Sequence, residues 1–200
     1  MARIRHPAEA APVTPSGGAR AGIRVKIVDL FIGNILNAVD AKGRASLPST
    51  YRNVVERRQQ RMAPPDGQQP EKLQAPEKLV TFMPHPRRTC LMGFDAAYAQ
   101  VLLTDLRKGA KDAEGGELAA LQDAEMAAFS DMMPVSYDPG GRMVLPPYLR
   151  DCAGITDLAY FVSGAEIFEV WDPETFRRER PELTGAQRQL TAFLAERAAK

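Results

Sequence analysis

Two segments of the sequence place aspartate, glycine and arginine at the same spacing. They read Asp40-Ala-Lys-Gly-Arg44 and Asp138-Pro-Gly-Gly-Arg142. The glycine before each arginine permits a positive φ, and an aspartate carboxylate can accept backbone N–H groups across such a turn. The arginine follows on the returning strand, where an exposed pair with the aspartate contributes only about 0–1 kcal/mol. Both segments are therefore predicted to be tight turns that present an arginine.

The two turns belong to a longer internal repeat. Asp40–Arg52 and Asp138–Arg150 are identical at six of 13 positions, and both continue from the arginine to Leu-Pro. The later matching segments are 79–82 with 159–162 and 90–95 with 167–172. Chance similarity between two turn-rich segments is disfavoured because order and spacing recur. One half is too small to bury a core, whereas two halves that interlock their hairpins can close a barrel.

Strand and helix signals alternate without the long crossovers of a parallel sheet. The strand-like runs are 30–36, 44–47, 78–83, 89–94, 143–145, 158–162 and 166–171. Helix starts are predicted after Asp95 and Asp172, and Thr184 with Gln187 has the spacing of a capping box. The fold class is therefore predicted to be α+β with a β core and short peripheral helices.

Charge and composition divide the chain. Residues 1–62 contain 11 Lys and Arg against 4 Asp and Glu, whereas the remainder contains 15 against 21. A basic first third is typical of a polyanion binder, although a charge-segregated solvated surface is an alternative interpretation. The predicted organisation is a disordered basic arm (1–28), a first repeat (29–110) with a proline-rich insertion (63–76), a second repeat (111–180) and a C-terminal helix (181–200).

Several function classes are disfavoured by what the sequence contains. Cys90 and Cys152 are too few for a disulfide framework or a four-thiolate zinc site, and the two histidines lie beside prolines. No uninterrupted apolar run approaches the length of a membrane span. The turn aspartates are the sole acid–base candidates, so an enzyme is disfavoured and no cofactor or metal is expected.

These residues resemble a known family. The run Phe31-Ile-Gly with the Asp40–Arg52 segment, the second turn through Pro146, and Phe168-Glu-Val-Trp-Asp172 closely resemble MraZ, a bacterial transcriptional regulator of the AbrB-like swapped-hairpin barrel superfamily. The resemblance covers about residues 31–176. It implies a pseudo-dimeric swapped-hairpin β-barrel, association of chains into a homo-oligomeric ring, and a cytoplasmic, nucleoid-associated location.

The resemblance also implies a partner and its contact residues. The ring would bind double-stranded DNA at promoter direct repeats of the division and cell-wall gene cluster, with contacts from Lys42, Arg44 and Arg142. The turn-shaping residues would be Asp40, Gly43, Asp138 and Gly141. Gly140 stands where the first turn has a lysine, which leaves Arg142 as the sole cation of the second turn.

Three alternatives stay open at this point. The turn arginines could be fully occupied by their aspartates and serve the fold alone. The chain could be an antitoxin-like or scaffolding protein-binding module of the same barrel superfamily, which would favour a disordered C-terminal tail. Further basic pairs, Arg57-Arg58 with Arg61 and Arg87-Arg88, could extend a basic face or simply be solvated.

Overall fold

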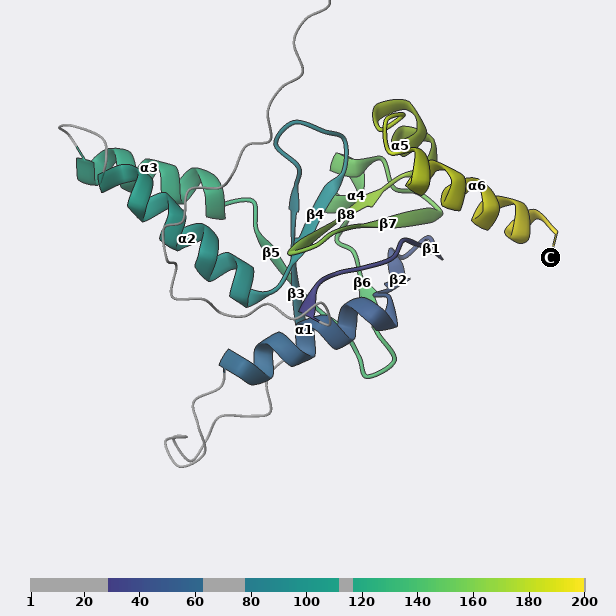
Figure 1. Ribbon diagram of the computed structural model, residues 1–200, viewed down its shortest axis with the longest axis horizontal. Helices are drawn as coiled ribbons and strands as arrows, with labels where there is room; N and C mark the ends of the chain where they lie inside the picture. Colours follow the sequence, from purple (N-terminus) through teal and green to yellow (C-terminus); the bar gives the residue numbers. More distant parts are fainter. Residues whose placement is uncertain (1–28, 63–77, 112–116, 200) are drawn as a thin grey trace, which may run out of the picture.

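The computed structural model describes residues 29–62, 78–111 and 117–199 (Figure 1). The predicted arm (1–28) and the predicted proline-rich insertion (63–76) both lie outside the described residues. Within those ranges the chain forms eight strands and six helices. The predicted α+β class is therefore confirmed.

The elements follow one another along the chain in the same order in both halves. The strands are β1 (Ile35–Ala38), β2 (Arg44–Ser46), β3 (Leu79–Pro84), β4 (Leu91–Phe94), β5 (Met133–Ser136), β6 (Arg142–Val144), β7 (Leu158–Gly164) and β8 (Ile167–Trp171). The helices are α1 (Ser49–Met62), α2 (Ala96–Lys111), α3 (Glu117–Phe129), α4 (Pro147–Ala153), α5 (Pro173–Glu179) and α6 (Thr184–Ala198). Each half thus runs strand, turn, strand, helix and hairpin; α2 and α5 follow the two hairpins, α3 precedes β5, and α6 follows α5.

The strands of the two halves pair with each other. The antiparallel pairings build a six-stranded sheet of order β1-β7-β8-β4-β3-β5, and β2 pairs with β6 in a separate two-stranded ribbon. If each strand is replaced by its equivalent in the other half (β1 by β5, β3 by β7, β4 by β8), the large sheet has the same strand order read in the opposite direction. The two halves therefore pair reciprocally. Because β1 lies on β7 and β5 lies on β3, the first strand of each half is held by the other half. Strands β1 and β5 are the sheet edges within the described ranges, and closure into a barrel stays a prediction.

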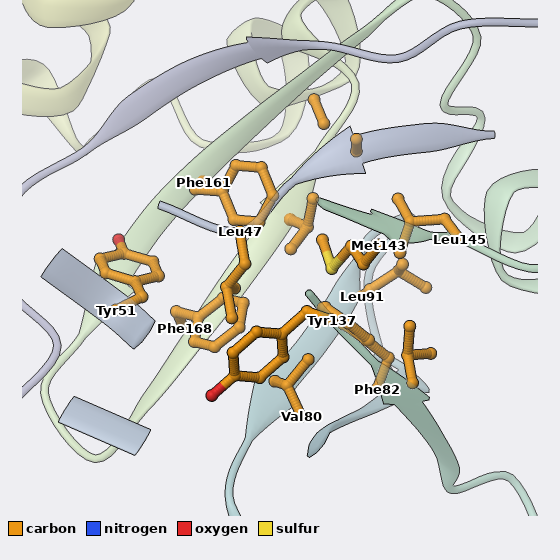
Figure 2. Close-up of a cluster of buried hydrophobic side chains, with 14 of the residues drawn as sticks. Leu47, Tyr51, Val80, Phe82, Leu91, Tyr137, Met143, Leu145, Phe161 and Phe168 are labelled. Carbon is orange, nitrogen blue, oxygen red and sulfur yellow. The ribbon is translucent and has the colours of Figure 1, made fainter. Parts of the chain in front are cut away.

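An aromatic cluster fills the space between the sheet and the ribbon. Phe168 is fully buried, with ring centroids 5.0 Å from Phe31, 4.9 Å from Tyr51 and 5.9 Å from Phe82. Gly93 lies opposite Phe168 in the β4–β8 register, and a Cβ there would lie 2.3 Å from the Phe168 ring. Figure 2 shows side chains from both halves meeting in this core. The halves therefore share one hydrophobic core.

Local signals account for most helix starts, although one predicted cap is wrong. The Asp95 and Asp172 side chains accept the N–H groups of Tyr98 at 3.0 Å and Thr175 at 2.8 Å, which confirms both predicted caps. The capping box at Thr184 is wrong, because Thr184 is already helical and Leu183 holds the cap position without a side-chain bond. The Gln187 amide instead donates to two carbonyls of the preceding segment, at Phe176 and Arg180, and so ties α6 to α5.

One strand begins later than the sequence suggests. The run 30–36 was expected to be continuous, but β1 starts at Ile35. Gly33 has a φ of +86° and interrupts the extended chain, and Phe31 forms an isolated bridge with Ala165 before the interruption. This arrangement carries the Phe31 ring into the core while β1 continues along the sheet edge.

Helices α2, α3, α5 and α6 lie away from the β2–β6 ribbon (Figure 1). Helices α2 and α3 lie side by side and are joined by an ion pair of 2.9 Å between Arg107 and Glu125. Helix α6 contributes Leu190 to a second buried cluster with Tyr160 and Trp171. None of the described helices is both long and apolar enough to cross a membrane.

We predict that Phe168→Ala lowers the free energy of unfolding by about 3–5 kcal/mol, because it removes the ring around which the core is packed. Urea unfolding followed by circular dichroism measures the change. Met126→Ala is the matched control, since Met126 is 70% exposed and its truncation is expected to stay within about 0.5 kcal/mol. Equal effects from the two variants would contradict the packing described here.

Candidate nucleic-acid interface

The first turn is organised around the Asp40 carboxylate. Its Oδ1 accepts the backbone N–H groups of Lys42 and Arg44, both at 2.9 Å, and its Oδ2 accepts the Arg44 Nε–H at 2.5 Å. The Gly43 N–H donates to the Asp40 carbonyl at 2.8 Å, and Gly43 has a φ of +78°. The carboxylate therefore fixes the turn and the base of the arginine side chain together.

The second turn repeats this arrangement with a looser arginine. Asp138 Oδ1 accepts the Arg142 backbone N–H at 2.8 Å, and the Asp138 carbonyl accepts the Gly141 N–H at 2.8 Å. Gly141 has a φ of +84°. The Arg142 Nη1 lies 3.9 Å from Asp138 Oδ2, so the side chains are farther apart than in the first turn.

Each turn is also held by the other half. The Leu47 N–H donates to the Gly141 carbonyl at 2.8 Å, and the Leu145 N–H donates to the Gly43 carbonyl at 2.9 Å. A Cβ at Gly43 would lie 2.6 Å from the Leu145 carbonyl oxygen, and one at Gly141 would lie 2.8 Å from the Leu47 carbonyl oxygen. Glycine is thus required at both positions for its positive φ and for this close approach. The Arg52 guanidinium donates to the Pro139 carbonyl and fixes the second turn further.

The β2–β6 ribbon between the turns has one buried and one exposed face. Ala45 and Met143 oppose each other in the register and are buried at 5% and 3% exposure. The exposed face carries Arg44, Ser46, Arg142 and Val144. Because side chains alternate along a strand, packing Ala45 and Met143 inward directs both arginines outward.

The exposed face borders an open groove with a volume of about 600 Å³. Its lining residues are Arg44, Pro134, Val135, Ser136, Tyr137, Asp138, Arg142, Met143, Val144 and Pro146. The structure therefore brings the two turn arginines, which lie 98 positions apart in the chain, to one concave surface. Lys42 is exposed on the first turn but is not among the residues that line the groove.

Both turn arginines remain accessible to a ligand. The side chain of Arg44 is 64% exposed and that of Arg142 is 83% exposed. Among the described residues the terminal nitrogens of Arg44 have no hydrogen-bond partner, because Asp40 is contacted through Nε. The geometry therefore does not favour the alternative in which the two aspartates fully occupy both arginines. A guanidinium with free terminal nitrogens can still donate two parallel hydrogen bonds.

Other basic residues proposed from the sequence serve the fold. Arg58 is 11% exposed and lies 3.3 Å from the buried Asp95 carboxylate, with its guanidinium 5.1 Å from the Phe31 ring centre. Arg61 and Arg57 both lie against the buried Asp29. Arg58 is therefore an internal ion-pair partner and does not belong to an extended basic face on α1.

The two arginines of the second basic pair, Arg87 and Arg88, have different surroundings. Arg88 Nη1 donates to Glu169 at 2.9 Å, and Arg180 contacts the same carboxylate at 2.9 Å. Arg87 is exposed on the β3–β4 loop. Sequence reasoning did not identify Glu169 as the centre of this network, because its basic partners come from two separate segments, the β3–β4 loop and the end of α5.

The described part of the chain contains no group of three or more His, Cys, Asp or Glu side chains that could hold a metal ion. Cys90 is buried, which raises the pKa of its thiol and makes it a poor nucleophile. The exposed arginine-bearing ribbon is thus the candidate site.

Comparison with known proteins identifies the class of the chain. A relative from Rhodospirillum rubrum is 31% identical over 163 residues, which cover 78% of this chain and 90% of the relative. A relative from Gluconacetobacter diazotrophicus is 29% identical over 164 residues, 82% of this chain and 91% of the relative, and one from Rickettsia canadensis is 28% identical over 151 residues, 76% and 87%. All three are named as transcriptional regulators.

That class narrows to one family. The name that these three relatives carry is Transcriptional regulator MraZ, and the chain belongs to the MraZ family. The resemblance inferred from the paired turns is therefore confirmed. No family model matches the chain.

We predict that the pKa of the Asp40 carboxyl lies below its ordinary value. The cause is first the hydrogen bond from the Arg44 backbone and then that from the Arg44 side chain. Carbon-detected NMR titration of the Asp40 carboxyl measures this pKa. Because a depressed pKa stabilises the fold above about pH 3.9, this contribution is lost as the pH falls through the folded-state pKa.

Two variants separate the causes of this shift. Arg44→Ala is expected to raise the pKa of Asp40 only part of the way, since the backbone N–H of residue 44 remains. Arg177→Ala removes a comparable surface ion pair of 3.1 Å with Glu174 and is expected to leave Asp40 unchanged. An unchanged Asp40 titration in Arg44→Ala would show that the side-chain pair does not form in solution.

Proposed function

We propose that this protein is a sequence-specific DNA-binding transcriptional regulator that places the β2–β6 ribbon against double-stranded DNA. The observation that carries the proposal is the exposure of Arg44 and Arg142 on one face of a two-stranded ribbon. The major groove of B-form DNA is wide enough to admit such a ribbon, and other β-ribbon proteins read bases there. Membership of a family of transcriptional regulators supports the same assignment.

The proposed contacts follow from the geometry of the side chains. Arg44 and Arg142 each donate a bidentate pair to the O6 and N7 of a guanine, worth about 1–3 kcal/mol of discrimination. Lys42, exposed on the first turn, is suited to a phosphate contact as a mobile point charge. Asp40 and Asp138 hold the turns by accepting backbone N–H groups, and with Gly43 and Gly141 they set the direction of both arginines.

The proposed assembly is a homo-oligomeric ring of AbrB-like swapped-hairpin barrels that binds promoter direct repeats of the division and cell-wall gene cluster in the bacterial nucleoid. The reciprocal strand pairing of the two halves supports the swapped hairpins. A ring makes physical sense because a single turn contributes little, whereas several turns on one duplex bind as an intramolecular set. The antitoxin-like alternative favours a disordered tail, and residues 184–198 are helical instead.

We predict that Arg44→Ala removes most sequence-specific binding while the fold and assembly stay intact, because the side chain is exposed and its ion pair adds little stability. Mobility-shift titration of a duplex enriched from a random-sequence pool measures the change, at matched salt. Arg177→Ala is the control, an exposed arginine on α5 with an equivalent ion pair. Equal affinity of Arg44→Ala and the wild-type protein would reject the proposed role.

We further predict that deletion of Met1–Arg24 weakens binding to all sequences alike. The deleted segment contains four arginines and one glutamate. If these arginines contact phosphates, the slope of log K against log salt concentration becomes shallower by up to about 3–4, since each neutralised phosphate contributes about 0.9. Titrations at four salt concentrations with specific and scrambled duplexes measure the slopes. An unchanged slope would show that this segment does not bind DNA.

A further inference from the structure

The exposed face of the ribbon is mixed in character and differs between its two ends. Arg44 lies directly opposite Val144 in the register, and Ser46 lies directly opposite Arg142. Val144 and Ser46 occupy equivalent places in the two repeats, two residues after the arginine. One end of the ribbon therefore pairs an arginine with a branched apolar side chain, and the other end pairs an arginine with a hydroxyl.

Val144 is one of the large apolar side chains exposed on the described surface. It is 52% exposed, whereas its neighbours Met143 and Leu145 are buried at 3% and 0%. It lines the same groove as Arg44 and Arg142. Its side chain is not part of the hydrophobic core and is therefore available for contact with a partner in the groove.

We propose that Val144 is a specificity-determining residue that contacts the 5-methyl group of a thymine beside the guanine bound by Arg44. This inference rests on the proposed DNA-binding function and deepens it. Thymine presents its methyl group in the major groove, where apolar side chains distinguish it from cytosine. The charge of the groove suits this occupant, since the exposed Arg44 and Arg142 line it with Val144 and attract a polyanion, whereas the one lining carboxylate, Asp138, accepts the Arg142 backbone N–H.

The dimensions of the ribbon fit neighbouring base pairs. Directly opposite residues of an antiparallel pair have Cβ atoms about 4.5–5.5 Å apart. Successive base pairs of B-form DNA are stacked about 3.4 Å apart. A long arginine and a short valine that start at this separation can reach adjacent steps, so the Arg44–Val144 pair reads a guanine and a neighbouring thymine together.

The same geometry makes the two ends of the ribbon inequivalent. Ser46 carries a hydroxyl beside Arg142, and a hydroxyl can donate to or accept from either kind of base edge. The Arg142 end is therefore more tolerant of the neighbouring base, whereas the Arg44 end prefers thymine. The bound DNA element is expected to be correspondingly asymmetric.

Deoxyuridine substitution tests this inference directly, because it removes only the methyl group. The probe is the duplex that the full-length wild-type protein enriches from a random-sequence pool, with each thymine replaced in turn by deoxyuridine. Mobility-shift titration at fixed salt is expected to find a thymine whose replacement weakens wild-type binding roughly three- to fourfold, the value of one buried methyl group. In Val144→Ala the same replacement is expected to have no effect.

Two further variants sharpen the comparison. Val144→Ser installs the side chain of the other repeat and is expected to lose thymine preference while it retains the Arg44-dependent guanine preference. Val101→Ala is the matched control, since it truncates a valine that is 46% exposed on α2, and it is expected to keep the full deoxyuridine effect. Light scattering on every variant reports the oligomeric mass.

The outcomes separate this inference from the function on which it rests. Equal deoxyuridine effects in the wild-type protein and Val144→Ala, with Arg44→Ala still defective, would overturn the role of Val144 alone. A change of oligomeric mass in Val144→Ala without any change in thymine preference would also overturn it and identify Val144 as a subunit contact. Failure of the wild-type protein to enrich any duplex would overturn both proposals.

Discussion

The pairing of β2 with β6 is the interaction on which the candidate site depends. Three register pairs join these strands, and the Leu47 and Leu145 N–H groups extend the ladder to the glycine carbonyls of the opposite turns. Each turn is therefore completed by backbone from the other half. Neither half can present its arginine in this geometry by itself, which explains physically why two copies of the turn occur in one chain.

Burial divides the arginines of the molecule into two kinds. Arg58 is 11% exposed beside Asp95, which is fully buried, and removal of either charge would leave the other unpaired inside the protein. The Arg44–Asp40 pair is exposed, so water can replace either partner at little cost. An arginine of the second kind can exchange part of its environment for a ligand without loss of the fold. In the described part of the first third of the chain, the basic residues therefore have a structural role at Arg58 and, under the proposed function, a recognition role at Arg44.

The sequence was most informative where local chemistry decides the structure. The turns, the two aspartate caps and the strands of the repeat follow from spacing and residue type. Strand β5 was not predicted, because Pro134 argues against a strand, and the structure accommodates it at the sheet edge, where proline is tolerated. The partners of Arg58 and Glu169 could not be predicted either, since they are distant in the chain and meet only through the fold. The groove beside the ribbon depends on β5 and was missed for the same reason.

The positions at which the two repeats agree and differ support this division of roles. Among the six identical positions, the glycine and the leucine of each repeat are buried where the two halves meet. The aspartate of each repeat accepts the hydrogen bonds that shape its turn. Packing therefore constrains these residue types. The repeats differ at exposed positions, Lys42 with Gly140 and Ser46 with Val144, and also at two buried ones, Ala45 with Met143 and Tyr51 with Leu149. Arg44 and Arg142 are identical although both are largely exposed, so neither burial nor the weak second ion pair of 3.9 Å accounts for arginine at both places. Under the proposed function a shared DNA contact accounts for the identity, and the divergent neighbours are where the two ends of the ribbon can acquire different preferences.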